Sequence, residues 1–247
     1  MEPRGGKGMR SAAWIWLLVV AIGAAVLVGR HTFEVTWYLN RVLAYLRTLH
    51  FSQLDGPHFA VRYPRGAEED ARLVLAAAEH FYPLVDRDFG GRLPQKNIVI
   101  LVNRFADNRT MGQYSRGVIE VLVPSRWLPP VGDRASLFYA EGPLAHELTH
   151  LAVDLLTRGN VPRWFTEGVA QYEESKLTGQ APAADTTGTW SSAPFESEAG
   201  QEEAYAQALD RILRFKAYGG EEYLYQIMAK LAAGARIDEL LPPVCWG

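Results

Sequence analysis

The sequence predicts an α+β protein, in which a small mixed β-sheet packs on helices and the second half of the chain is mainly helical. Strand patterns lie between residues 59 and 123, whereas helical periodicity dominates after Pro124. An apolar segment near the amino terminus adds a predicted transmembrane helix. Charged residues make up 21% of the 247 residues and hydrophobic residues 48%, so the composition favours a packed core.

The amino-terminal apolar segment, residues 11–28, contains 18 residues without a charge. A helix of that length spans roughly 27 Å, close to the thickness of the hydrocarbon core of a bilayer. Basic residues concentrate before it, and such residues favour the cytoplasmic side. We therefore expect a cytoplasmic tail at 1–10, a single-pass anchor at 11–29, and the rest of the chain outside the cytoplasm. A cleaved signal peptide is the alternative, although no convincing cleavage site follows Gly29.

An amphipathic helix follows the apolar segment, and we assign residues 30–54 to this juxtamembrane element. Its apolar residues recur at spacings of three and four between Val35 and Leu49. Four arrangements are open to it. It can continue the anchor as a stalk, lie at the membrane surface, pair with a second copy, or pack back onto the folded domain.

The folded domain is expected over residues 55–247 and starts with strands and one helix. Alternating apolar residues predict a strand at 59–63. Three acidic residues open a helix whose apolar stripe runs from 68 to 81, and Pro83 or the following glycine pair ends or kinks it. The β-branched run 97–102 is typical of a strand covered on both faces. The segment 117–123 predicts another strand, for which the pattern suggests an edge position in the sheet.

The second half of the domain contains four predicted helices, at about 143–156, 162–177, 203–216 and 221–232. Residues 178–201, between the second and third, are rich in Ala, Ser, Thr, Gly and Pro. This loop is longer than most connections in compact domains. It is expected to be a mobile flap or a disordered insertion.

The charge and cysteine content exclude several functions. A net charge of −3 and a pI near 6.1 provide no basic field, so we do not expect nucleic acid as a partner. The single cysteine, Cys245, excludes an intrachain disulfide and a zinc site built from several thiolates. Any zinc must therefore be held by histidine and carboxylate.

The stretch AEGPLAHELTHLAVDLL, residues 140–156, places such residues in an apolar helix. HELTH has the form H-E-x-x-H, and residues four apart share a helix face, so His146 and His150 can bind one ion. Glu147 is rotated about 100° from His146, which puts its carboxylate beside the ion as a candidate base. Polar groups in so apolar a helix lose free energy on burial unless they are compensated, and a metal ion would do this.

A third ligand is expected because a catalytic zinc usually takes three protein ligands and leaves one position open. The segment VPRWFTEGVAQYEE, residues 161–174, offers Glu167 among aromatic residues in the first two turns of a predicted helix. Glu167 is therefore the candidate third ligand.

These two motifs resemble those of the gluzincin metallopeptidases, in particular the peptidase MA-like domain family, with thermolysin and the aminopeptidase N group more distant in pattern. Sixteen residues separate HELTH from the glutamate of WFTEG. The resemblance covers residues 55–235 and implies a zincin-like fold. It also implies that His146, His150 and Glu167 bind Zn²⁺ and that Glu147 is the catalytic base.

The chain departs from the thermolysin-like pattern at Gln171, four residues after Glu167, where those enzymes carry a carboxylate that orients a histidine ligand. Asp154, one turn beyond His150, is a candidate replacement, and a solvated position on the helix face is its alternative role. Tyr205, in EEAYAQAL, is a candidate catalytic donor to the oxyanion, with core packing as the alternative.

The expected function is that of a membrane-anchored zinc peptidase, of the endopeptidase type, acting on polypeptides outside the cytoplasm. Zinc activates a water molecule, and Glu147 accepts its proton and delivers it to the leaving amine. Two other functions fit the motifs. One is a pseudopeptidase scaffold that holds zinc and binds a partner through the same groove. The other is an aminopeptidase, for which Glu120 could anchor the free amine of the substrate.

Overall fold

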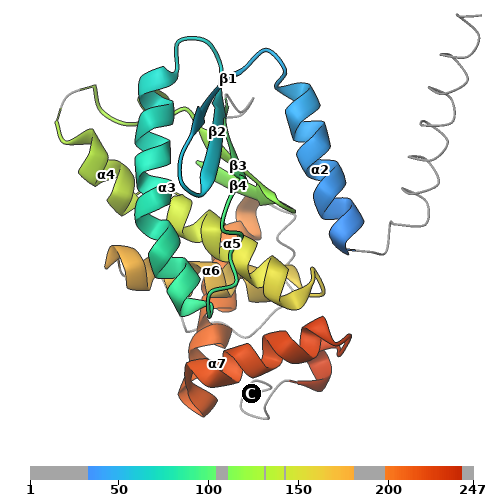
Figure 1. Ribbon diagram of the computed structural model, residues 1–247. Coiled ribbons are helices and arrows are strands. Elements are labelled where there is room, and N and C mark those ends of the chain that lie inside the picture. The colour runs from blue at the N-terminus through green and yellow to red at the C-terminus, as the bar shows by residue number, and fades with distance from the viewer. Residues whose placement is uncertain (1–32, 104–110, 131, 142, 181–197, 241–247) are drawn as a thin grey trace, which may run out of the picture.

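The computed structural model describes residues 33–103, 111–130, 132–141, 143–180 and 198–240 (Figure 1). The predicted cytoplasmic tail and membrane anchor lie outside these ranges, and the 178–201 loop is described only at its two ends. Within the described ranges, no helix combines the length and the apolar character needed to cross a bilayer.

Five strands form one mixed sheet: β1 (Ser52–Asp55), β2 (Phe59–Tyr63), β3 (Ile98–Asn103), β4 (Gly112–Ser115) and β5 (Val118–Leu122). Their order across the sheet is β1-β2-β3-β5-β4. The three inner strands run parallel to one another, and each outer strand pairs antiparallel with its neighbour. The predicted α+β class with a small mixed sheet is confirmed.

The central strand β3 is covered on both faces, as its β-branched sequence predicted. Ile100 is buried in the main core and Leu101 is buried on the opposite face. The edge position suggested for the strand at 117–123 is wrong, because β5 lies between β3 and β4. The edge on that side of the sheet is β4, a strand that the sequence pattern did not predict.

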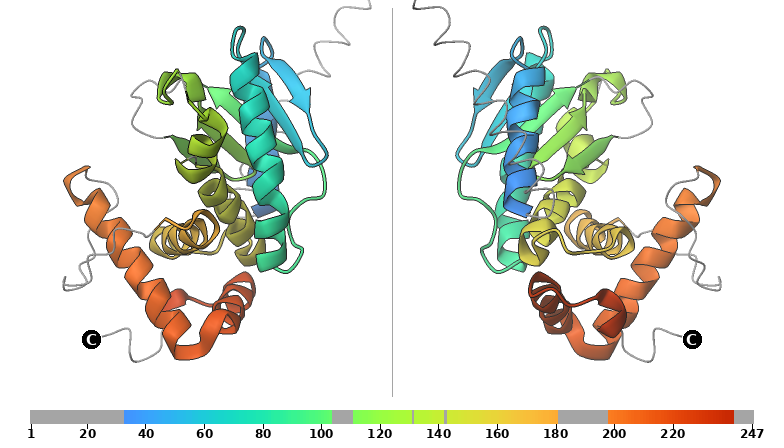
Figure 2. Two further views of the ribbon diagram at one scale, coloured as in Figure 1. Left: turned by 90° about the vertical axis from the view of Figure 1, so that its left-hand side faces the viewer. Right: turned by 90° about the vertical axis from the view of Figure 1, so that its right-hand side faces the viewer.

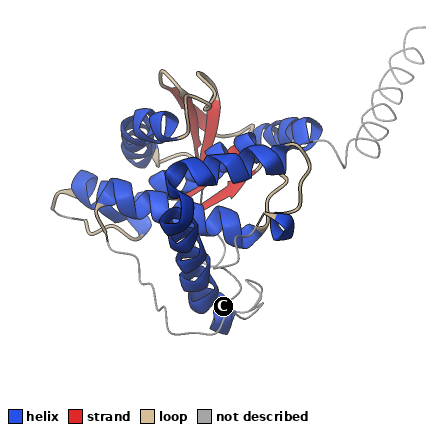
Figure 3. Cartoon of the chain, turned by 90° about the horizontal axis from the view of Figure 1, so that it is seen from below, coloured by secondary structure: helices blue, strands red, loops and turns tan. Residues whose placement is uncertain are grey.

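Helices cover one face of the sheet (Figures 2 and 3). α3 (Glu68–Asp88) and α5 (Leu144–Thr157) pack against it, with α4 (Arg134–Glu141) beside α3. α6 (Arg163–Thr178) packs on α5, and α7 (Glu198–Ala232) packs on α6. The main core lies between the sheet and these helices and contains Phe59, Ile100, Ile119, Leu148 and Leu151. The HELTH and WFTEG motifs on α5 and α6 are thereby held in this layer of packed helices.

The predicted helix boundaries hold with small changes. α3 continues through Pro83 and ends before the glycine pair at 90 and 91, both with positive φ. The two helices predicted at 203–216 and 221–232 are two arms of α7, which meet at Gly220 with φ of 73°. α4 was not predicted, although its sequence is amphipathic.

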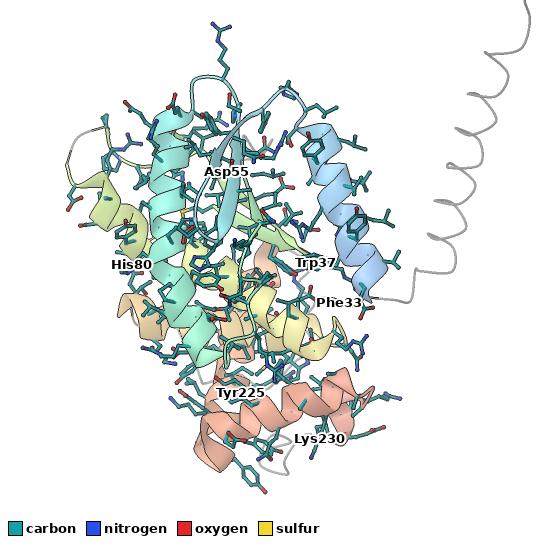
Figure 4. All side chains as sticks on the ribbon, viewed as in Figure 1. Phe33, Trp37, Asp55, His80, Tyr225 and Lys230 are labelled. Atoms are coloured by element: carbon teal, nitrogen blue, oxygen red, sulfur yellow. The ribbon has the colours of Figure 1, made fainter. Side chains whose placement is uncertain are left out.

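The other face of the sheet is covered by α2 (Phe33–Arg47). Ala44 packs against Leu101 and Val118, and all three are almost fully buried. The ring of Trp37 packs on Gly117, where a β-carbon would come within 2.5 Å of it. Figure 4 labels Phe33 and Trp37, which point from α2 toward the domain. Of the four arrangements open to this helix, packing back onto the domain is the one that the structure shows.

The juxtamembrane helix is shorter than the assigned 30–54. It ends at Arg47, and residues 52–55 form β1, which pairs with β2. The expected domain start at residue 55 therefore falls inside a strand of the sheet. SQLD offers little β-propensity of its own, so pairing with β2 determines its conformation.

Candidate metal centre

The HELTH motif lies in the first two turns of α5. Pro143 occupies the position before the helix, and its carbonyl accepts a hydrogen bond from the backbone N–H of Glu147 at 2.9 Å. Proline suits this position because the missing N–H has no partner there in any helix. Both histidines therefore stand on a formed helix, four residues apart on one face.

Glu167 reaches the same point from α6, which begins at Arg163 directly after Pro162. Its Oε2 lies 3.4 Å from His146 Nε2 and 3.2 Å from His150 Nε2. One ligand atom from each of the three residues can be chosen so that all lie within 4.8 Å of one another. The structure thus brings together the three residues predicted as metal ligands.

Each ligand is held by a second side chain. His146 Nδ1 donates to Glu174 Oε2 at 2.9 Å, and His150 Nδ1 lies 2.8 Å from Thr166 Oγ1. Because a carboxylate can only accept, Glu174 fixes the hydrogen on Nδ1 and leaves Nε2 of His146 as the candidate ligand atom.

The Glu167 carboxylate is oriented in a similar way. Arg163 Nε donates to its Oε1 at 3.2 Å, which leaves Oε2 directed at the two histidines. The guanidinium also offsets part of the negative charge on a buried carboxylate.

In the metal-free chain the carboxylates of the cluster stabilise the protonated form of His146. Burial lowers the pKa of His146, but hydrogen bonds to Glu167 and Glu174 outweigh it and raise this pKa to about 10. Burial favours a raised pKa for Glu167, yet hydrogen bonds from the two histidines hold it well below its usual range. Burial lowers the pKa of His150. A proton on His146 thus supplies the positive charge that the carboxylates attract.

Glu147 lies beside the cluster, as its place in the helix predicted. Its side chain is 5% exposed, and burial raises its pKa to about 7. The backbone N–H of Tyr114 on β4 donates to the carboxylate. Its Oε2 is buried without a hydrogen-bond partner among the described residues. This oxygen therefore has an unused acceptor position among the described residues.

Asp154 does not orient a histidine ligand, and neither does it have the solvated position that was its alternative. It is 8% exposed, and its Oδ2 accepts a hydrogen bond of 2.5 Å from the hydroxyl of Tyr114. That bond fastens β4 to α5. Gln171 donates to the backbone carbonyl of Tyr205 at 3.0 Å, so it positions α7 and not the metal ligands.

Tyr205 lies at the site. It lines a cavity of about 850 Å³ together with the metal-ligand cluster and the strand β4. Its hydroxyl is hydrogen-bonded to Arg163, and burial raises its pKa. Tyr205 is thus a neutral donor at the wall of the cavity, and its alternative role in core packing does not describe its position.

Glu120 is not at the site. It lies on β5, facing α2, where its carboxylate pairs with Arg47 at 3.3 Å. It is not among the residues that line the cavity, so the proposed anchor for a free amine is wrong.

Sequence reasoning missed Glu174, Thr166 and Arg163. Glu174 follows Glu167 by seven residues, or two helical turns, and therefore shares its face of α6. The helical period was the signal that could have found Glu174. Comparison of the sequence with protein-family models and with curated proteins gives no match.

Proposed function

We propose that this protein is a zinc-dependent peptidase of the gluzincin type, anchored in a membrane by residues 11–29. The observation that carries the proposal is the cluster of His146, His150 and Glu167 with the unpartnered carboxylate oxygen of Glu147 beside it.

The donor set fits zinc. Two imidazole nitrogens and one carboxylate oxygen are the ligands of one common type of catalytic zinc site, in which a fourth position stays open. The site also has the outer hydrogen bonds that orient zinc ligands, from Glu174 and Thr166. His146, His150 and Glu167 would hold the ion. Glu147 is not expected to be a fourth ligand, because it is buried and its carboxylate accepts a hydrogen bond from the backbone of β4.

A bound zinc ion would supply Lewis acidity toward a carbonyl oxygen and a water molecule. The free oxygen of Glu147 is the proton acceptor, and the same oxygen returns the proton to the leaving amine. In the metal-free chain, burial raises the pKa of this carboxylate to about 7. The Tyr205 hydroxyl, held by Arg163, is the candidate donor to the developing oxyanion.

An extended polypeptide is the substrate class that suits this cavity. Gly112, Gln113, Tyr114 and Ser115 of β4 line it. Among the described strands β4 pairs only with β5, so the backbone groups of its outer edge are available to a further strand, apart from the Tyr114 N–H that donates to Glu147. A peptide that pairs with this edge as an added strand would lie beside Glu147.

The proposal is tested with the full chain reconstituted in liposomes and given an unfolded protein as substrate. Glu147→Gln fills the same volume but cannot accept a proton, so we expect the rate to fall by about 10² to 10⁴ with zinc content unchanged. Glu222→Gln, an exposed change on α7, serves as the matched control and is expected to keep full activity.

Two results contradict the proposal. Undiminished turnover by Glu147→Gln removes this residue from the mechanism. A wild-type chain that holds zinc but cleaves nothing supports the pseudopeptidase scaffold instead.

A further inference from the structure

The outer face of α2 is strongly apolar although it is turned away from the domain. This face consists of Tyr38, Val42, Leu43, Tyr45 and Leu46, and Leu49 continues it just past the end of the helix. Their exposed fractions range from 37% to 66%. Of these residues Tyr45 also contacts the domain, because the guanidinium carbon of Arg62 on β2 lies 4.5 Å from the centre of its ring. The right-hand panel of Figure 2 shows α2 as the outermost element on that side, with no described element over it. Contiguous exposed apolar residues of this kind mark an interaction surface.

The charges of α2 do not interrupt this face. Arg41 donates to the carbonyl of Asn97 at 2.6 Å, and Arg47 pairs with Glu120. Glu34 pairs with Arg158 at the end of α5. Each of the three charged side chains of α2 thus contacts the folded domain, so the helix presents mainly apolar groups outward.

The position of α2 in the chain indicates what covers its outer face. The uncharged segment 11–28 ends five residues before Phe33, the first residue of α2. A helix that begins so close to a membrane-crossing segment must start at the bilayer surface. Two tyrosines among aliphatic side chains also fit this location, because tyrosine is enriched at the interface between hydrocarbon and water.

We propose that the outer face of α2 lies in the interfacial region of a lipid bilayer, while its inner face holds the sheet. The inference rests on the membrane anchorage in the proposed function and not on peptidase activity. In this arrangement α2 lies between the lipid and the folded domain. The contact of Phe33 with Gly159 then places one end of the cavity, which Gly159 and Arg116 line, beside the membrane.

Spin labels test this arrangement in the full chain. Cysteine is introduced at Val42 or Leu46 in a Cys245→Ser background, and the labelled protein is placed in phosphatidylcholine liposomes. The matched control carries the label at Glu222, on the exposed surface of α7. We expect the ratio of oxygen collisions to water-soluble nickel-chelate collisions to be several-fold higher at 42 and 46 than at 222.

Three outcomes overturn the inference. Equal collision ratios at the three positions place the outer face in water. Dipolar broadening at 42 that disappears on dilution with unlabelled chain shows a second copy there. A label shielded from both reagents shows that another part of the chain covers the face. Release of the protein from the liposomes by alkaline washing would instead contradict the anchor, and zinc content and proteolysis are measured separately on the same sample.

Discussion

His146 depends on a carboxylate that lies outside both sequence motifs. Glu174 accepts from its Nδ1 at 2.9 Å and so sets both the tautomer and the direction of Nε2. Without this bond the imidazole could turn or place its hydrogen on Nε2, the nitrogen proposed to bind the ion.

Glu174→Gln is expected to weaken zinc binding by about 10- to 100-fold, because the amide is a poorer acceptor and removes a charge that raises ligand basicity. Affinity is measured by competition with a chelator of known strength. Glu222→Gln is the control for loss of an exposed charge. Equal affinity for zinc in wild type and Glu174→Gln would remove Glu174 from the centre.

Glu147 makes the stability of the zinc-free chain depend on pH. Its pKa is raised from 4.5 to about 7, so the folded chain binds this proton more tightly than the unfolded chain. The free energy of unfolding therefore falls as the pH rises from 4.5 to about 7. Above that range the loss is roughly 3 kcal/mol at most.

The glutamine of Glu147→Gln cannot ionise, so this variant does not lose stability as the pH rises through this range. We expect the zinc-free variant to exceed wild type in free energy of unfolding at about pH 8, with the difference shrinking as pH falls to about 4.5. Urea unfolding in the presence of a chelator measures it. A difference that grows as the pH falls would mean that the carboxylate is stabilised in its charged form.

Residues of the candidate centre could be predicted from the sequence where the helical period alone determines which side chains lie close together. His146, Glu147 and His150 follow from one helix, and Glu167 required only that a second helix pack on the first. Tyr114 could not be predicted in this way, because its contacts with Asp154 and Glu147 depend on the pairing of a four-residue edge strand.

α6 and α7 approach each other closely at Gly168, the residue after Glu167. A β-carbon there would lie 2.4 Å from the carbonyl oxygen of Ala208 and 2.7 Å from Ile212 Cγ1. The glycine of WFTEG therefore serves packing, and it keeps α7 close enough for Tyr205 to reach the cavity.

Gly168→Ala is expected to destabilise the protein by about 1 to 3 kcal/mol, because backbone of α7 must move to admit the methyl group. Ser175→Ala, on the same helix, is the control and should change stability by less than about 0.5 kcal/mol. Urea unfolding of the zinc-loaded proteins provides the measurement. Stability equal to wild type would show that α7 is free to shift.

Long periodic elements were predicted within a few residues, whereas short ones were not. α5 and α6 carry their own pattern over 14 and 16 residues. β1 and β4 have four residues each, too few for a pattern, and they form because β2 and β5 offer backbone groups to pair with. The position of α2 against the sheet depends on contacts with residues more than 50 positions away, such as Leu101. The local sequence of the helix could not predict these contacts.

At the scale of the molecule, α2 is part of the folded domain. It covers Leu101 and Val118, which are 1% and 2% exposed. A chain shortened to begin at residue 55 loses this cover and most of β1. We expect its Tm in mild detergent to be at least about 5 °C below that of a chain that begins at residue 33. Equal Tm values would show that α2 contributes nothing to the stability of the domain.

The zinc content of the full chain and of His150→Ala tests the central claim most directly. If His146, His150 and Glu167 form the centre, the wild-type protein holds one zinc ion per chain after purification. His150→Ala, in which only two of the three ligands remain, should lose that zinc to a mild chelator while the protein stays folded. Elemental analysis of both proteins after the same chelator treatment supplies the answer. Stoichiometric, chelator-resistant zinc in His150→Ala would contradict the assignment of this centre.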